Sequence, residues 1–566
     1  MDSSLINSIL FIYFQKMTSL TSKILFSTLC KVFETLSTSK GAQRSKIFRD
    51  FIENLRKKAA NLKSQDPQVS TSYFPIIRIF LSKLDKERGP NGFKEKALAF
   101  LFVRIFCLGK NSTDAKKILN YREPIKSLSS NDFAERCHGV LRAKMNVRGS
   151  LTVDDIDKFL DKIALQYKNN EKQDNEFIKI VDKCTALELK WLIRIILHDL
   201  RLSLGAKTIF DAYHPDAERL YSEKADLRYM CETLADLSVK IDRRISNLSI
   251  FSPFKPMLLE RLSITEIKKL FVDNSEFIIQ TKFDGERSQV HIKDGRFKYF
   301  TRHGVDITNN PCYGECRGSR GFLTNKIASL LSPECKSIIL DGEMMGFHKE
   351  KKEFSTKGVA FDVKKLTMTS KHQPCLIAFD VLLYNDEILV DKPLEYRLKI
   401  LEKAFQESPG ILLRSKNERV SSVEEILEAF NKSSDNFEEG IVVKRIDGKY
   451  KVNTREGSGC YKIKAEYSGE LIRDVDLVIV GGYYGEGRFS GMFSSFLVAA
   501  VEQKEEGRRI FHPVTSVGTG LTDEEVRGLN RKFERYWTKT KPEGVEGLRR
   551  GAPDVWIRPE DSIVLQ

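Results

Sequence analysis

The first part of the chain carries a helical pattern. From about residue 25 to residue 248, apolar residues recur three and four positions apart, with turn residues between the segments. Such spacing brings apolar side chains to one side of a helix. The clearest stretch runs from Leu187 to Leu204, where Trp191 and Ile195 fall on one side and Gly205 follows as a helix stop. We therefore expect an all-helical block over residues 25–248, with one helix from Leu187 to Leu204.

A different pattern begins after two prolines. Pro253 and Pro256 cannot sit inside a helix, so they mark a boundary near residue 249. Beyond them, short runs of β-branched and aromatic residues predict strands, and a helical pattern lies between them. This mixture predicts an α+β domain over residues 249–467. The predicted strands are Phe277 to Thr281, Ser337 to Leu340, Leu376 to Leu383, Gly440 to Val443 and Tyr461 to Lys464, and the helix is Val423 to Phe430.

The last region, residues 468–566, resembles neither of the first two in texture. It opens with the apolar run Asp476 to Val480, and four glycines follow between residues 481 and 487. Short strands and glycine turns are typical of a small β-barrel. A helical pattern from Asp523 to Trp537 interrupts them. The 566 residues therefore hold three domains, in agreement with a prior of roughly 150 residues per domain.

Composition and charge narrow the class of protein. With 41% hydrophobic and 30% charged residues, the chain is typical of a globular protein and not of a disordered or fibrous one. Its net charge of +15 favours a polyanionic partner, because lysine and arginine release counterions from phosphate backbones. For individual side chains of the helical block, such as Arg194, Arg201 and Lys207, a solvated face is an equally good interpretation.

Cysteines and the amino-terminal residues add little chemistry. The ten cysteines are scattered, and the close pair Cys312 and Cys316 lacks a second pair at zinc-site spacing, so we expect reduced thiols. Residues 1–24 are expected to form an extension. Its apolar run from Leu5 to Phe14 is too short for a membrane span and follows no basic residues, so no membrane partner is expected. Met17 is a possible alternative start.

One motif carries nucleophilic chemistry. Residues 282–287, Lys-Phe-Asp-Gly-Glu-Arg, directly follow the predicted strand Phe277 to Thr281. A lysine amine that has lost its proton is a nucleophile, and phosphorus in a nucleotide is a suitable electrophile. Gly285 would let the backbone pass close to a bound ligand. The ordinary alternative is a charged strand end beside a turn.

A predicted hairpin supports an anion site next to this motif. Residues 288–301 read as two strands joined by the two-residue turn Asp294-Gly295. Counting back from that turn places Arg287 opposite Arg302. Like charges so placed repel unless an anion lies beside them, and a one-residue slip in register would remove the argument.

Three carboxylates belong to the candidate site. Asp341 and Glu343 share one strand face, and Glu439 precedes a buried-looking run that ends at Lys444. Carboxylates beside phosphates usually need a divalent metal such as Mg²⁺ between them. Each of these features also occurs in ordinary strands.

An aromatic residue and two lysines follow the same logic. Phe379 is either a core residue or a platform on which a base stacks. Lys462 and Lys464 share one strand face, which suits them to compensate phosphate charge. The order of all these segments together points to a nucleotide site.

The succession of motifs resembles that of the covalent nucleotidyltransferases, which include ATP-dependent DNA ligases, RNA ligases and mRNA capping enzymes. Residues 191–196 and 254–258 look like parts of the DNA-binding domain and following junction of eukaryotic DNA ligases. The chain is therefore identified as similar to eukaryotic ATP-dependent DNA ligases, nearest to their end-joining ligase IV branch, from about residue 25 to its end. A function in RNA capping or RNA ligation would not explain why the chain carries the helical block.

The resemblance implies three domains and their functions. They are an all-α DNA-binding domain over residues 25–248, an α+β nucleotidyltransferase (adenylation) domain over 249–467, and an OB-fold β-barrel over 468–566, incomplete at its C-terminus. Lys282 would be the adenylated nucleophile, with ATP and Mg²⁺ as cofactors. The implied nucleotide-binding residues are Gln280, Thr281, Lys282, Phe283, Arg287, Arg302, Glu343, Phe379, Lys444, Lys462 and Lys464, and the implied metal ligands are Glu343 and Glu439.

The resemblance also implies a substrate, partners and a location. The substrate would be double-stranded DNA with nicks or breaks, joined in the nucleus during non-homologous end joining. Members of the ligase IV branch bind a coiled-coil scaffold protein through paired C-terminal modules, and we expect this binding region to be absent here.

Three departures from the family pattern are expected to matter. Cys460 stands where relatives carry a bulky aromatic, and Gln280 where ligase IV relatives tend to carry glutamate near the adenine. The chain ends at Gln566, before the Arg-x-Asp-Lys motif that would follow. We therefore expect a truncated form that is weak in adenylation. The alternative is a fragment that binds DNA ends without turnover.

Overall fold

The computed structural model describes residues 19–123, 132–242, 248–271, 275–319, 321–355, 362–464, 475–504, 507–548 and 551–565. Most of the extension expected over residues 1–24 lies outside these ranges. Contacts divide the chain into two compact units, Met1–Ala212 with Ile472–Gln566, and Tyr213–Leu471. No helix in the described ranges combines the length and the apolar character that crossing a membrane requires.

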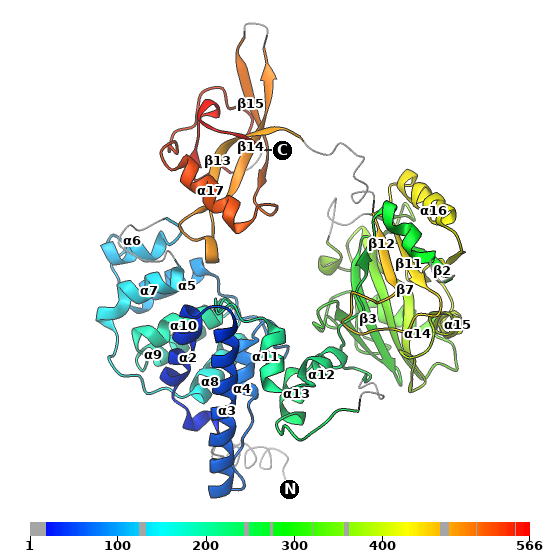
Figure 1. Ribbon diagram of the computed structural model, residues 1–566, viewed down its shortest axis with the longest axis horizontal. Coiled ribbons are helices and arrows are strands. Elements are labelled where there is room, and N and C mark those ends of the chain that lie inside the picture. Colours follow the sequence, from blue (N-terminus) through cyan, green and yellow to red (C-terminus); the bar gives the residue numbers. More distant parts are fainter. Residues whose placement is uncertain are drawn as a thin grey trace. The chain divides into compact units, whose positions relative to one another are not determined.

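The N-terminal part of the first unit is helical, as predicted (Figure 1). Its helices are α2 (Phe26–Thr38), α3 (Ala42–Gln65), α4 (Phe74–Phe80), α5 (Glu95–Ile105), α6 (Thr113–Leu119), α7 (Phe133–Leu141), α8 (Val153–Leu165), α9 (Asn170–Val181), α10 (Ala186–Ile196) and α11 (Ala206–Tyr213). Two more helices, α12 (Ala217–Glu223) and α13 (Leu227–Thr233), belong to the second unit.

Helix α10 forms the centre of the helical part. It begins with a capping box, in which the side chains of Thr185 and Glu188 each accept a hydrogen bond from the other's backbone N–H. Trp191 is fully buried, and its ring centroid lies 4.9 Å from that of Phe33 in α2. Its indole N–H donates to Glu34 over 2.8 Å, so the aromatic ring is buried without leaving its polar atom unpaired.

The prediction of one helix from Leu187 to Leu204 is wrong at its C-terminal end. Helix α10 ends at Ile196, and Gly205 directly precedes α11. His198 and Arg201 adopt positive φ angles of 53° and 54°, which a helix does not allow. Apolar residues continue beyond Ile196, so the pattern alone could not show where the helix ends.

The basic side chains singled out in the helical part have different surroundings. Arg194 is buried and lies 2.6 Å from Asp132, and Arg201 lies 2.9 Å from Asp199. Only Lys207 is exposed. The interpretation as a solvated face therefore holds for Lys207, whereas Arg194 contributes to the packing of α7 against α10.

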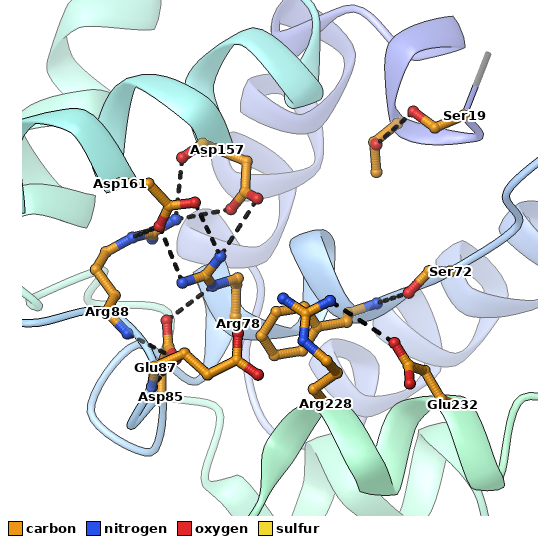
Figure 2. A network of polar contacts seen from close by, with 12 residues as sticks. Ser19, Ser72, Arg78, Asp85, Glu87, Arg88, Asp157, Asp161, Arg228 and Glu232 are labelled. Atoms are coloured by element: carbon orange, nitrogen blue, oxygen red, sulfur yellow. Dashed lines mark hydrogen bonds and ion pairs between the residues drawn. The ribbon is translucent and has the colours of Figure 1, made fainter. Parts of the chain in front are cut away.

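A network of charges fixes the segment that follows α4 onto α8 (Figure 2). Arg78 lies 2.8 Å from Asp85 and 3.1 Å from Asp161, and Arg88 lies 2.8 Å from Asp157 and 2.9 Å from Asp161. Both arginines are largely buried. Such groups are tolerated inside a protein only when their charges and hydrogen bonds are satisfied, as they are here.

The second unit contains two β-sheets (Figure 1). The first sheet has the strand order β1-β12-β11-β2-β10, and the second has the order β4-β3-β5-β7-β8, with β6 beside β5 and β9 beside β7. The strands of the first sheet are β1 (Glu260–Arg261), β2 (Phe277–Thr281), β10 (Glu418–Val420), β11 (Ile441–Arg445) and β12 (Cys460–Ile463). Those of the second are β3 (Glu286–Lys293), β4 (Arg296–Thr301), β5 (Ser337–His348), β6 (Phe354–Ser355), β7 (His372–Tyr384), β8 (Glu387–Ile388) and β9 (Leu412–Arg414).

Helices pack on each of the two sheets, and each sheet forms a separate hydrophobic core with its helices. The 3₁₀ helix η3 (Ile264–Phe271) and α16 (Val423–Asp435) pack on the first sheet, and α14 (Phe322–Leu330) and α15 (Leu394–Ala404) pack on the second. Side chains alternate across a strand, so when Ile441 and Val443 enter the first core, Val442 and Lys444 point the other way. The predicted α+β class is confirmed, and each predicted strand is present. The bounds of β2 agree with the prediction, whereas β5 and β7 extend beyond it and β11 and β12 are shifted by one or two residues.

The predicted hairpin is also confirmed, including its register. Strands β3 and β4 pair from Lys293 opposite Arg296 back to Ser288 opposite Thr301. Asp294 and Gly295 have φ angles of 49° and 75°, as a type I′ turn requires.

The C-terminal part of the first unit is an OB-like β domain. Its sheet has the order β15-β14-β13-β16, with β17 beside β13, and the helix predicted over residues 523–537 ends at residue 533. Its elements are β13 (Leu477–Tyr484), β14 (Phe493–Gln503), β15 (Arg509–Val517), α17 (Asp523–Phe533), β16 (Val555–Trp556) and β17 (Val564–Leu565).

An irregular segment, residues 251–257, runs beside β3 and is called the strap below. Three side chains at alternate positions of β3 share one face of that strand and hold the strap by its backbone. The bonds are Phe251 N to His291 Nδ1 (3.0 Å), Phe254 N to Gln289 Oε1 (3.2 Å), Gln289 Nε2 to Phe254 O (2.6 Å) and Arg287 Nη1 to Met257 O (2.6 Å).

His291 makes this attachment sensitive to acid. Its ring is fully buried, Nδ1 accepts the N–H of Phe251, and burial lowers its pKa from 6.5 to about 3. Between these two values the unfolded chain binds a proton that the folded chain does not, so the free energy of unfolding falls as pH falls. We expect His291 to contribute a slope of up to about 1.4 kcal/mol per pH unit.

Urea unfolding between pH 7 and pH 4 checks this expectation. His291→Phe removes the titrating group from the site and should flatten the fall in stability, whatever it does to stability at pH 7. His512→Gln, which changes a histidine that is 46% exposed, should change the slope less than His291→Phe does. Equal slopes for the wild type and His291→Phe would contradict the assignment.

Candidate active site

The second unit contains a pocket of about 760 Å³ lined by residues of both sheets. This volume is within the range of sites for ligands of nucleotide size, roughly 300–1,000 Å³. Lys464 is the one predicted site residue outside its lining. The predicted residues that line the pocket are Gln280, Thr281, Lys282, Phe283, Arg287, Arg302, Glu343, Phe379, Glu439, Lys444 and Lys462.

Lys282 lies directly after β2, and its side chain is only 18% exposed. Its backbone N–H donates to Gly440 O over 2.9 Å, which ties the end of β2 to the start of β11. Its ammonium lies 2.5 Å from Glu439 Oε2. The amine therefore points into the pocket and not into solvent.

Glu439 holds two lysines at once. Its Oε2 accepts from Lys282 and its Oε1 lies 2.6 Å from the ammonium of Lys464. Burial by itself would raise the pKa of Glu439, but the hydrogen bonds from these two lysines outweigh burial and lower it. The carboxylate is thus ionised and compensated, and Lys464 belongs to the site through it.

A glycine presents Glu439 to the pocket. Gly440 has a φ of 136°, and a Cβ there would lie 2.2 Å from the carbonyl oxygen of Ile463 in β12. Other residues cannot adopt this conformation without strain. Gly285 lines the pocket and is also required for space. A Cβ there would lie 2.6 Å from Met344 O, so the close approach is to β5.

The two carboxylates on β5 have different surroundings. Asp341 is fully buried and pairs with Arg287, with Arg287 Nη2 2.6 Å from its Oδ2, whereas Glu343 lines the pocket. Burial raises the pKa of Glu343 to about 7, against the opposing effect of Arg287 and Lys282. A cation placed beside a buried carboxyl group of this kind stabilises its ionised form.

Arg287 and Arg302 both line the pocket, but the predicted position of Arg287 directly opposite Arg302 in the hairpin is wrong. Pairing of β3 with β4 stops one position earlier, at Ser288 and Thr301, so the two arginines are not cross-strand partners within the ladder. Burial lowers the pKa of Arg302, and the charges of Arg287 and Arg455 lower it further. Three cations therefore lie near one another at the mouth of the pocket, as an anion site requires.

Phe379 lies at the pocket wall between cations. Lys444 Nζ lies 4.6 Å, and Arg287 Cζ 5.4 Å, from its ring centroid. Lys444 is buried, and burial lowers its pKa against the opposing charge of Asp380. Phe379 is half-buried and not a core residue, so one part of its surface remains available to a planar ligand.

Gln280 and Cys460, the two residues that depart from the family pattern, lie in different surroundings. Gln280 lines the pocket, and its Nε2 donates to Asn417 Oδ1 over 2.6 Å. Cys460 is 5% exposed and packs in an apolar cluster that includes Phe254 and Tyr450. The thiol therefore fills space behind the site and does not line the pocket.

Sequence reasoning missed several lining residues. Most of them lie in loops or irregular segments, where no periodicity marks them, whereas Lys364 lies in a 3₁₀ helix (Val363–Lys365) and Asp380 in β7. The proline-bounded motif at residues 254–258 marked only Met257 and Leu258. These residues are Met257, Leu258, Leu259, His303, Lys364, Asp380, Tyr450 and Arg455.

Three family models match the chain. They are described as ATP dependent DNA ligase domain over residues 256–464, DNA ligase N terminus over 25–214, and ATP dependent DNA ligase C terminal region over 489–565. The chain belongs to the ATP-dependent DNA ligase family. The ligase domain match contains every residue that lines the pocket.

Individual members of the ligase family are similar along nearly the whole chain. DNA ligase 4 of Gallus gallus is 37% identical over 560 residues, and that of Homo sapiens 36% over 563, each match covering 97% of this chain. DNA ligase 4 of Arabidopsis thaliana is 29% identical over 581 residues, covering 96% of this chain and 45% of that protein. The chain spans about 60% of the length of the first two relatives.

Proposed function

We propose that this chain is an ATP-dependent DNA ligase that joins 5′-phosphate and 3′-hydroxyl DNA ends through AMP carried on Lys282. The observation that carries the proposal is the arrangement of Lys282, Glu439 and Lys464 at a pocket of nucleotide size. It supplies a nucleophilic amine, a carboxylate that orients it and a second cation for phosphate.

The reaction divides into three displacements at phosphorus. Lys282 Nζ, having lost its proton, bonds to the α-phosphorus of ATP as the bond to pyrophosphate breaks. A DNA 5′-phosphate oxygen then bonds to the same phosphorus, and the N–P bond breaks. Finally the neighbouring 3′-hydroxyl attacks the 5′-phosphorus and AMP leaves. Positioning and neutralisation of charge supply most of the rate in such transfers.

The remaining side chains have roles in binding. We assign Lys462 and Lys464 to neutralising the α-phosphate, and Arg287 and Arg302 to binding the sugar and further phosphate. Lys462, Arg287 and Arg302 line the pocket, and the contact between Lys464 and Glu439 supports the assignment of Lys464. Phe379 supplies the surface on which adenine stacks. Gln280, held by Asn417, lies in the wall of the same pocket, beside Thr281 and Phe283.

The acidic residues fit magnesium as the metal. Among the described residues, no three His, Cys, Asp or Glu side chains gather closely enough to hold a metal by themselves. Magnesium does not need such a cage, because it is bound by one or two carboxylates together with substrate phosphates and water. Glu343 and Glu439 are the residues that would hold it, and it would neutralise charge that develops on the phosphates.

The wider role follows the DNA ligase 4 relatives. We infer that the substrate is double-stranded DNA with nicks or breaks, that joining serves non-homologous end joining, and that the protein acts in the nucleus. The net charge of +15 supports a nucleic-acid partner.

Sealing of a nicked duplex tests the proposal. A duplex with one 5′-phosphorylated nick is incubated with the protein and ATP, and the product is resolved on a denaturing gel. Full-length strand should form only with both ATP and Mg²⁺. Binding of the same duplex is measured in parallel, and binding without any sealing would favour the alternative, a DNA-binding role.

A further inference from the structure

The hydroxyl of Tyr450 lies at the centre of a buried network next to the pocket. Tyr450 follows β11 in an irregular segment and is 4% exposed. Its hydroxyl donates to Asp341 Oδ2 over 2.6 Å and accepts the backbone N–H of Met257 over 3.1 Å. One oxygen therefore joins the second sheet to the strap, residues 251–257.

The same network holds Arg287. Its Nε lies 3.0 Å from Asp341 Oδ1 and its Nη2 lies 2.6 Å from Asp341 Oδ2, so the contact is bidentate. Its Nη1 donates to Met257 O over 2.6 Å. A planar guanidinium held on three sides has one orientation. Arg287 also lines the pocket, so this orientation is the one that a ligand meets.

Asp341 and the backbone N–H of Met257 depend on the Tyr450 hydroxyl, which also accepts from Arg287 Nη2 over 3.2 Å. Asp341 is fully buried, and its Oδ2 is shared by Tyr450 and Arg287. Burial raises the pKa of Tyr450 above its ordinary value, so the hydroxyl keeps the proton that it donates. Without the hydroxyl, the carboxylate would lose a donor and the N–H of Met257 its acceptor, and both would move to find new partners.

We propose that Tyr450 is a positioning residue for nucleotidyl transfer, whose hydroxyl fixes Asp341 and the strap so that Arg287 faces the nucleoside triphosphate in one orientation. This inference rests on the proposed function. Tyr450 acts through Arg287 and takes no part in bond making. Displacement of a positioned group by about 1 Å can reduce a rate by roughly 10²-fold, so a one-atom change here should act mainly on kcat.

Tyr450→Phe removes only the oxygen, and Tyr299→Phe is its matched control. Tyr299 is also fully buried in the same unit, and its hydroxyl lies 2.8 Å from Thr324 Oγ1. The rate at which ATP labels the chain is measured over a range of ATP concentrations. Tyr450→Phe should lower kcat about 10- to 30-fold with KM within about threefold, while Tyr299→Phe should keep both values near those of the wild type.

A double-mutant cycle separates positioning from simple loss of stability. If Tyr450 acts through Arg287, then Tyr450→Phe should have little further effect on kcat in an Arg287→Lys background. Full additivity of the two changes, a wild-type kcat in Tyr450→Phe, or an equal loss of kcat in Tyr299→Phe would each overturn the inference. A wild-type chain that ATP does not label contradicts the proposed function instead, so the two failures are distinguishable.

Discussion

Lys282→Arg should abolish labelling of the chain by ATP that carries a radioactive α-phosphate. Arginine keeps the positive charge and the means to pair with Glu439, but its guanidinium does not lose its proton in proteins and cannot attack phosphorus. We expect the rate of labelling to fall by at least about 10⁴-fold, because a missing nucleophile leaves no other route to the covalent intermediate. Acid-quenched samples resolved on a denaturing gel measure this directly.

Two controls confine this result to the nucleophile. Lys293→Arg makes the same change at the far end of β3, where the lysine is partly exposed and pairs with Asp386, and should label normally. Lys282→Arg should also still join a nick whose 5′-phosphate already carries AMP, because the last displacement needs no lysine adduct. Labelling of Lys282→Arg at the wild-type rate would place the nucleophile elsewhere.

Glu439→Gln has the second largest expected effect. The carboxylate accepts from Lys282 and from Lys464 at the same time, and a neutral amide can offer an oxygen to only one of them. The other lysine would face an N–H group and turn away. We expect labelling to slow by about 10²- to 10³-fold, the size of loss that follows when one preorganised donor to the developing charge is displaced, here a lysine. Rapid-quench kinetics at saturating ATP measure the loss.

The neighbouring residue provides the control for this prediction. Glu438 has the same side chain, precedes Glu439 and is exposed. Glu438→Gln should therefore label within about twofold of the wild type, since exposed substitutions away from a site have small effects. If Glu439→Gln also labelled at that rate, the contact between Glu439 and the two lysines would have no role in the reaction.

The strands that carry the site could be predicted because their patterns are local. Strand β2 has the predicted bounds, Phe277 to Thr281, since β-branched residues fill it and a charged motif ends it. The turn Asp294-Gly295 fixed the register of β3 and β4, because two consecutive positive φ angles suit those residues. Once these strands were predicted, the site residues could be assigned to the strands that carry them.

Other features depend on packing that no local pattern shows. Asp341 and Glu343 share a strand face, yet the first is paired beneath Arg287 and only the second reaches the pocket. Tyr450 and Met257 come from irregular segments and meet only when the chain has folded. For the same reason the sequence did not show that Gly285 must also make room for the carbonyl of Met344.

The strap sets a limit on where the nucleotide-binding part of the chain can be cut. A fragment that starts at Glu260 would contain both sheets but would lose the backbone groups that satisfy Gln289, His291 and one nitrogen of Arg287. Three side chains of a single strand would then open to water beside the nucleophile. A shortened protein made for screening inhibitors must therefore begin upstream of Phe251, although every catalytic group lies downstream of it.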